Sequence, residues 1–313
     1  MNGVSGRRSG RLRYILQTLS LLLASGLVCV SSALADTTVS GTISTNTTWG
    51  LGGSPYVFAG DVTVASGVTL TLEPGVVVKL DSGDELDVDG TLLADGTSGQ
   101  PIVFTSIKDD TAGGDTNGDG GATTPAAGDW YELNFSSPGS GSVLDYVEVR
   151  YAGAFGQSID VYTSGLSITN STIVDGSSYG IDVHSVSPTI ADSTIARHSS
   201  YGIYLVGSSA SITGNTIQDN SHGIYLSNSP GATITGNTIT GHASYGLYAD
   251  PDSAAVTWSG NVMSDNGYTE DGLVVRVGTL TQSATWGTTD ALFIFAGDVT
   301  VVASPRNRYQ PLC

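Results

Sequence analysis

Short runs in this chain alternate apolar and polar residues, and a turn-forming residue follows each run. In "ITGNTIQDNSHGIYL" (residues 212–226), isoleucine and leucine fall on one face of each run, while Asn, Gly and Ser separate the runs. Alternation with a period of two residues predicts half-buried β-strands. Strands of this length cannot bury a core by themselves, so their apolar faces need neighbouring copies.

The same segment recurs at a nearly constant spacing. The isoleucine of "STI" or "NTI" is followed by its equivalents after 22, 22, 22 and 24 residues. A repeat of this length, built from short strands without a helical pattern, predicts a β-solenoid in which residues one period apart are neighbours. Three columns define the repeat: Ile173, Ile195, Ile217, Ile239 and Met263; Ile168, Ile190, Ile212, Ile234 and Val256; and Gly180, Gly202, Gly223, Gly246 and Gly272.

The repeats "NTIQDNSHGIYL" (215–226) and "NTITGHASYGLY" (237–248) resemble a known family. They are similar to the right-handed parallel β-helix repeats of secreted carbohydrate-active proteins and of the periplasmic NosD-like proteins. The resemblance covers residues 140–278. It implies an all-β fold, a right-handed parallel β-helix, which we expect to have about ten coils and an N-terminal cap.

The sequence predicts five segments along the chain. Residues 1–35 are expected to be a signal peptide, with four arginines before an apolar run and cleavage after Ala35. Residues 36–135 are expected to form the cap and irregular first coils with an acidic loop, and residues 136–278 the regular repeats. "TWGLGGSPYVFAGDVTV" (48–64) recurs as "TWGTTDALFIFAGDVTV" (285–301), so residues 279–304 are expected to begin a second copy of the N-terminal module.

The tail, residues 305–313, departs from this pattern. Our hypothesis is that it is the truncated or frame-shifted end of a longer multi-module protein, and the alternative is a natural C-terminal cap. Cys29 lies in the expected signal peptide and Cys313 in the tail, so we expect no intrachain disulfide. The signal peptide predicts a secreted or cell-surface protein, which we expect to be a monomer.

Charge narrows the choice of partners. With 29 acidic residues and only seven basic residues after residue 35, the mature chain would carry a net charge of −22. Such a surface repels nucleic acid and anionic lipid, so we expect neither as a partner. It also disfavours acidic polysaccharides unless a divalent cation bridges the two.

Two columns of the expected outer surface are aromatic. Tyrosine rings pack on sugar C–H groups and their hydroxyls form hydrogen bonds, so these columns are candidates for a carbohydrate-binding face. The alternative is a ladder of paired rings that only stabilises the sheet. The candidate binding residues are Tyr179, Tyr201, Tyr204, Tyr225, Tyr245 and Tyr248.

Charged residues on the outer columns offer alternatives. Asp160 and Asp182 lie one period apart, at about the carboxylate spacing of retaining glycosidases, which makes them candidate catalytic residues. Arg197 is a candidate base for a lyase, but aspartates flank it in its column and predict a surface ion ladder instead. The column Ser171, Ser193, Asn215, Asn237 and Asn261 predicts an asparagine ladder with a structural role.

One acidic loop has the spacing of a calcium site. The pattern D-x-N-x-D-G at Asp115, Asn117 and Asp119, together with Asp110, provides hard oxygen ligands, so we expect Ca²⁺ as a possible cofactor. The alternative is a solvated acidic loop. The histidines predict no copper or zinc site, since Asn220 separates His198 from His242 in their column. His184 and His222 lie in other columns.

Two functions follow from this reading. The first is a secreted, non-enzymatic β-helix module for adhesion or carbohydrate binding, with a polysaccharide or cell-surface glycan as its partner. The second is a polysaccharide-degrading hydrolase or lyase that uses Asp160 and Asp182. The first is favoured, because the sequence contains no three-group catalytic constellation and a module that repeats suits multivalent attachment.

Overall fold

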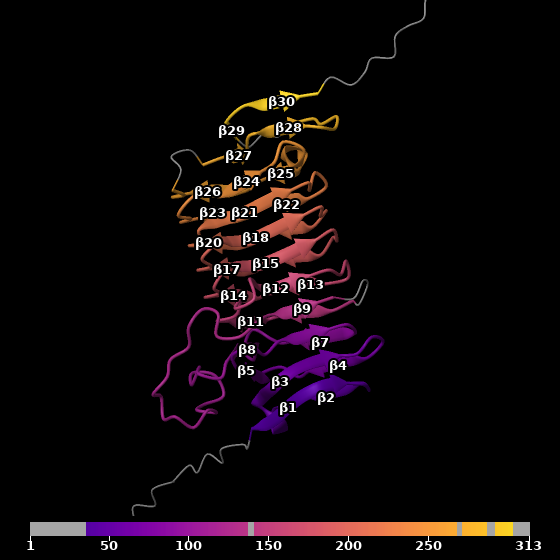
Figure 1. Ribbon diagram of the computed structural model, residues 1–313, viewed down its shortest axis with the longest axis vertical. Helices are drawn as coiled ribbons and strands as arrows, with labels where there is room; N and C mark the ends of the chain where they lie inside the picture. The colour runs from indigo at the N-terminus through magenta and orange to yellow at the C-terminus, as the bar shows by residue number, and fades with distance from the viewer. Residues whose placement is uncertain (1–35, 137–140, 268–270, 287–291, 303–313) are drawn as a thin grey trace, which may run out of the picture. The chain divides into compact units, whose positions relative to one another are not determined.

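A computed structural model of the chain describes residues 36–136, 141–267, 271–286 and 292–302. The expected signal peptide and tail lie outside these residues. Within the unit Leu34–Cys313 the chain winds into a parallel β-solenoid of about 12 turns (Figure 1). The predicted all-β solenoid is therefore confirmed, with slightly more turns than expected.

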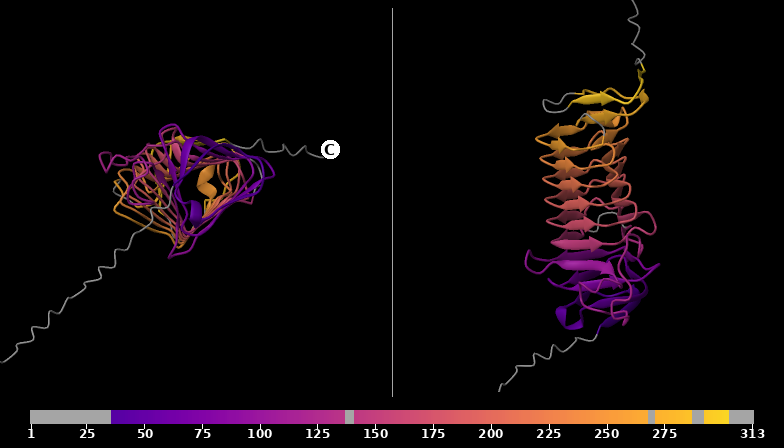
Figure 2. Two further views of the ribbon diagram at one scale, coloured as in Figure 1. Left: turned by 90° about the horizontal axis from the view of Figure 1, so that it is seen from below. Right: turned by 90° about the vertical axis from the view of Figure 1, so that its left-hand side faces the viewer.

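Every strand-to-strand pairing between named strands is parallel, so each strand pairs with its equivalent in the next turn. Viewed along the axis, successive turns superpose around a common interior (Figure 2). The larger sheet contains β1 (Thr37–Ile43), β3 (Tyr56–Val64), β5 (Val77–Leu80), β6 (Leu86–Val88), β8 (Ile102–Ser106), β9 (Leu133–Phe135), β11 (Val147–Arg150), β12 (Gln157–Val161), β14 (Thr172–Val174), β15 (Tyr179–His184), β17 (Thr194–Ala196), β18 (Tyr201–Val206), β20 (Thr216–Gln218), β21 (His222–Ser227), β23 (Thr238–Thr240), β24 (Leu247–Ala249), β26 (Val262–Ser264), β27 (Leu273–Val275) and β29 (Phe293–Phe295).

A second sheet closes each turn. It contains β2 (Thr47–Trp49), β4 (Thr69–Leu72), β7 (Thr91–Asp95), β10 (Val143–Asp145), β13 (Ser167–Thr169), β16 (Thr189–Ala191), β19 (Ser211–Thr213), β22 (Thr233–Thr235) and β25 (Thr257–Ser259). The remaining elements are the pair β28 (Gly278–Leu280) and β30 (Val299–Val301), and the 3-10 turns η1 (Leu51–Gly53) and η2 (Ser253–Ala255). Neither turn approaches the length of a membrane-spanning helix in the described residues.

The isoleucine columns line the interior. Ile195 pairs with Ile173 on one side and Ile217 on the other, and all three side chains are fully buried. The interior is thus a stack of aliphatic layers whose burial depends on the turn above and below.

One column assignment was wrong. Ile234 pairs with Trp258, not with Val256. The 3-10 turn η2 occupies Ser253–Ala255 and adds two residues before β25, which moves the inward position to Trp258. Both strand columns of this turn therefore step by 24 residues.

Asparagine and serine side chains form a buried ladder at one corner of the coils, as predicted. The backbone N–H of Asn215 donates to Oδ1 of Asn237, at 2.9 Å, and that of Asn237 donates to Oδ1 of Asn261, also at 2.9 Å. A second ladder mixes residue types, since His198 N–H donates to Asn220 and Asn220 N–H to His242. The histidines of this column thus contact backbone groups of the neighbouring turns.

The turn that follows each "TI" strand explains why acidic residues recur there. Asp175, Arg197, Asp219, Gly241 and Asp265 all have φ between 55° and 70°. This left-handed region favours Gly, Asn and Asp, so the aspartates of this column are turn formers.

The repeated N-terminal segment keeps its aromatic packing. Trp49 stacks on Tyr56 at 4.6 Å between ring centroids, and Trp286 stacks on Phe293 at 5.9 Å. The strand β27 pairs with β24 on one side and with β29 on the other, so the segment that contains Phe293 continues the stack of turns.

Candidate functional site

A cluster of charged side chains lies on the outer face of β12 and β15. Asp160 and Asp182 are paired residues of these strands, as the 22-residue period predicted. His184 follows Asp182 by two residues, so its side chain lies on the same face of β15. Nε2 of His184 lies 3.2 Å from Oδ1 of Asp160 and 3.2 Å from Oδ2 of Asp182. The imidazole therefore bridges the two carboxylates.

Neighbouring side chains hold this cluster in place. The ring of Tyr162 stacks on the imidazole of His184 at 4.5 Å and 7° between the ring planes. Nε2 of Gln157 donates to Oδ2 of Asp160 at 2.9 Å and to Oε2 of Glu132 at 2.6 Å. These contacts fix the imidazole and link the cluster to Glu132, next to β9.

The carboxylates of this face are poorly solvated. Asp160 is 6%, Asp182 5% and Glu132 4% exposed. Burial is the main cause that raises the pKa of Asp182 to about 6, against the opposing effect of His184. Burial, with Asp160 and Glu85 nearby, raises the pKa of Glu132 to about 8. The pKa of Asp160 is raised for the same first reason. The face thus concentrates negative charge where water solvates it weakly.

One oxygen of the cluster has no hydrogen-bond partner among the described residues. Oδ1 of Asp182 is buried and accepts no hydrogen bond, whereas Oδ1 of Asp160 faces Nε2 of His184 at 3.2 Å. One ligand atom from each of Asp160, Asp182 and His184 falls within 4.8 Å of the other two. Buried polar atoms in proteins nearly always have partners, so the oxygen of Asp182 needs an explanation.

Sequence reasoning found the two aspartates but missed the histidine. The histidines were compared only with one another, and His184 shares no column with another histidine. The signal that could have found it is the Asp-x-His spacing of 182–184 within a strand, because alternate residues of a strand share a face.

Beyond Asp182 the same outer column becomes aromatic. Tyr204 pairs with Asp182 in the next turn, and Tyr225 and Tyr248 follow. The rings of Tyr204 and Tyr225 stack at 4.9 Å, and those of Tyr225 and Tyr248 lie 5.4 Å apart. The structure thus brings the predicted tyrosines together on one face.

The second aromatic column interlocks with the first. Tyr179 stacks on Tyr204 at 5.1 Å, and Tyr245 stacks on Tyr248 at 4.8 Å. Tyr201 lies 5.3 Å from Tyr225, which is 6% exposed. Many ring faces are therefore covered by other rings. We call these six tyrosines the tyrosine face; its role in carbohydrate binding stays a prediction.

The acidic loop lies between β8 and β9 and projects from the coils (Figure 1). Carboxylate oxygens of Asp110, Asp115 and Asp119 come within 4.8 Å of one another. Nδ2 of Asn117 donates to Asp119 and to Thr123, and Oδ1 of Asn117 accepts from the backbone N–H of Asp119. Both carboxylate oxygens of Asp115 and of Asp119 accept backbone N–H groups of the loop. The aspartates thus hold the loop's turns, and calcium binding stays a prediction.

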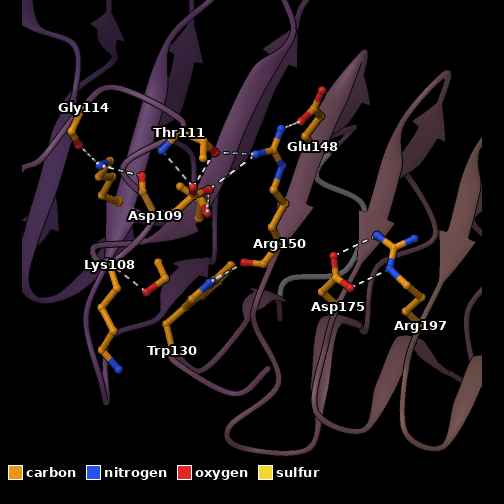
Figure 3. Close-up of polar contacts among 12 residues, drawn as sticks. Lys108, Asp109, Thr111, Gly114, Trp130, Glu148, Arg150, Asp175 and Arg197 are labelled. Carbon is orange, nitrogen blue, oxygen red and sulfur yellow. Dashed lines mark hydrogen bonds and ion pairs between the residues drawn. The ribbon is translucent and has the colours of Figure 1, made fainter. Parts of the chain in front are cut away.

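Buried charges fasten this loop to the coils. Lys79 on β5 is fully buried, and its Nζ donates to the backbone oxygens of Asp109, at 3.0 Å, and Gly114. Arg150 on β11 lies between Asp109 and Glu148 (Figure 3). Lys108 pairs with Asp129 at 2.7 Å. Asp109 and Asp129 therefore anchor the loop to the coils.

Arg197 pairs with one of the aspartates that flank it. Its Nε and Nη2 donate to the two carboxylate oxygens of Asp175, at 2.6 and 2.8 Å (Figure 3). This bidentate contact supports the surface ion pair over a lyase base.

Comparison with known proteins agrees with this architecture. Residues 157–286 match the family described as "Right handed beta helix region". This region therefore resembles right-handed β-helix repeats, the class that the sequence predicts, and the described residues form a parallel β-solenoid. A search of curated proteins gave no match.

A solved structure of a double mutant of the periplasmic alginate epimerase AlgG is also similar. It shares 13% sequence identity, with 84% of this chain and 76% of that chain covered and a TM-score of 0.43. At this level of similarity, its activity is not transferred to this chain.

Proposed function

We propose that this chain is a secreted or cell-surface β-helix module that binds a polysaccharide without cleaving it. The observation that carries the proposal is the tyrosine face, which extends over β15, β18, β21 and β24. Its side chains repeat at the strand spacing, so one extended ligand along the axis can make similar contacts at each turn.

The geometry favours contact with hydroxyls and ring edges. Because tyrosines cover one another, a sugar stacks only on the partly exposed rings and otherwise bonds to phenol hydroxyls. The fully buried strand positions beneath keep this face rigid, so little side-chain entropy is lost when a ligand binds. A net negative chain favours neutral glycans over acidic ones.

A glycan array with the purified protein tests the proposal. We expect binding to extended neutral polysaccharides, weakened at least tenfold in the double variant Tyr204→Ser/Tyr248→Ser, a loss of about 1.4 kcal/mol or more. Tyr146→Asn is the matched control, because Tyr146 lies at a turn outside this face with φ 47°. Unchanged binding in the double variant would overturn the proposal, provided that circular dichroism shows a folded protein.

One observation favours the hydrolase as a second candidate. Asp160 and Asp182 are close, and the raised pKa of Asp182, about 6, is what a general acid needs. The test is release of reducing sugar from each polysaccharide that binds. Hydrolysis that disappears in Asp182→Asn would replace the binding proposal by this one.

A further inference from the structure

The unexplained feature of the outer face is the pair of buried aspartates beside His184, one of which has an oxygen without a hydrogen bond. The described residues around this pair provide one imidazole, which faces both carboxylates at once. We infer that Asp160, Asp182 and His184 form a binding site for a divalent cation of the zinc class.

The separation of the ligand atoms fits a single ion. Nε2 of His184 is 3.2 Å from an oxygen of each aspartate. Two atoms that each lie about 2.1 Å from one ion, at tetrahedral or octahedral angles, are roughly 3.0–3.4 Å apart. The three side chains therefore need little movement to bind the same ion.

The charges require a positive partner. Two aspartates, 6% and 5% exposed, face one another across paired strands, and Glu132 lies beyond them. One protonated imidazole neutralises one carboxylate, and Oδ1 of Asp182 still lacks a hydrogen bond. A divalent cation neutralises both carboxylates and gives the carboxylate of Asp182 a ligand role.

The ligand set selects the kind of ion. Calcium and magnesium prefer oxygen ligands only, whereas an imidazole nitrogen with two carboxylates suits zinc and its neighbours. Second contacts resemble those that orient metal ligands: Gln157 donates to Asp160, and Tyr162 stacks on the imidazole. Three protein ligands leave one position for water or for a hydroxyl of a bound glycan.

This site and the hydrolase exclude one another, because a bound cation keeps both aspartates ionised and occupied. The inference does not depend on glycan binding, since the metal is titrated without any glycan. A protein that binds no glycan could thus still bind the metal. A protein that binds no metal could still bind a glycan.

The test is titration of Zn²⁺ and Co²⁺ into the purified full chain, prepared without a histidine tag and stripped with a chelator. We expect one Zn²⁺ per chain by calorimetry and visible Co²⁺ absorption bands typical of four- or five-coordination. His184→Ala should weaken binding by roughly 100-fold or more, since only two ligands remain. Asp182→Asn is a nearly isosteric second variant that should weaken binding similarly.

The matched control is His222→Ala. His222 lies on the same outer face, between Tyr201 and Tyr245, away from the cluster. It should bind zinc as the wild type does. Absence of zinc binding by the wild type at millimolar ion, or equal binding by the wild type and the folded His184 and Asp182 variants, would overturn the inference.

Discussion

The two halves of one outer column behave in opposite ways. Asp160 and Asp182 occupy it on β12 and β15, and Tyr204, Tyr225 and Tyr248 occupy it on the turns that follow. Stacked tyrosines lie about 5 Å apart and contact one another favourably. Stacked aspartates repel, and burial raises the pKa of both.

The comparison shows what a solenoid ladder demands of its side chains. A repeated aromatic or asparagine residue is satisfied by its own copies, because each copy is a suitable partner for the next. A repeated carboxylate is not, so it needs a proton or a cation from outside the column. The aspartate half of the column is therefore where an external partner is expected.

The largest effect is expected from placing a carboxylate in the tyrosine half. Tyr225→Asp should cost about 3–5 kcal/mol of unfolding free energy, because it removes a buried ring with its stacking contacts and places a carboxylate at a buried position. Urea unfolding measures the change, with the slope m as a check on the unfolded state. A cost below about 1 kcal/mol would show that the ladder does not depend on ring contacts.

The reverse exchange tests the other half. Asp182→Tyr extends the tyrosine column by one turn and removes one of the two like charges. We expect a gain of about 1 kcal/mol from the new ring contact and complete loss of zinc binding. A destabilised variant with intact zinc binding would contradict both expectations.

The pH dependence of stability tests the aspartate half through Glu132, whose pKa is raised by burial and by the nearby Asp160. The pKa of Glu132 is raised to about 8, so the folded state holds a proton that the unfolded state releases above about pH 4.5. Stability from this group therefore falls as pH rises toward 8, by up to about 1.4 kcal/mol per pH unit. We expect chelator-treated protein to lose stability from pH 6.5 to 8, and Glu132→Gln to flatten this loss.

Histidines set the opposite slope on the acid side. Burial lowers the pKa of His198 and of His242 to about 4, so the unfolded state binds protons first between pH 6.5 and 4. The free energy of unfolding should therefore decrease as the pH is lowered from 6.5 to 4. Asparagine already occupies this ladder at Asn220, so His198→Asn is a suitable replacement. It should reduce the loss of stability at acid pH. An unchanged acid slope would contradict this assignment.

The smallest effect concerns a single hydroxyl. Nη1 of Arg276 donates to the hydroxyl of Tyr225 at 2.7 Å. Tyr225→Phe keeps the ring contacts and removes this bond, so we expect a loss of only about 0.5–1.5 kcal/mol. A loss as large as that of Tyr225→Asp would assign the stability of the column to the hydrogen bond instead of the rings.

The repeat made most of the fold predictable. The fixed period placed Ile195 beside Ile217, Asp160 beside Asp182 and the tyrosines on one face, because period fixes lateral neighbours. The period assigned the wrong residue at Val256. There the turn η2 lengthens the spacing to 24 residues, and an apolar residue still stands at the 22-residue position. The period also could not show that Asp160 and Asp182 would be almost fully buried, since Tyr162, Gln157 and His184 shield them through side-chain packing.

Ring orientation was equally hidden from the sequence. A column of tyrosines is compatible with rings that face solvent or rings that face one another. The sequence left both open, and the structure shows extensive mutual stacking. His184 is not found by comparing equivalent positions of the repeats, because no other histidine shares its column. It is found only by comparing it with the aspartates on the same strand face.

The most direct test of the account is thermal unfolding of the wild type and of Asp182→Tyr, each with a chelator and with excess Zn²⁺. A ligand at 100 times its Kd stabilises the folded state by about 2.7 kcal/mol, which raises Tm by roughly 5–10 °C in a chain of this size. The account predicts such a rise for the wild type and none for Asp182→Tyr. A wild-type Tm that zinc leaves unchanged, or an equal rise in the variant, would contradict it.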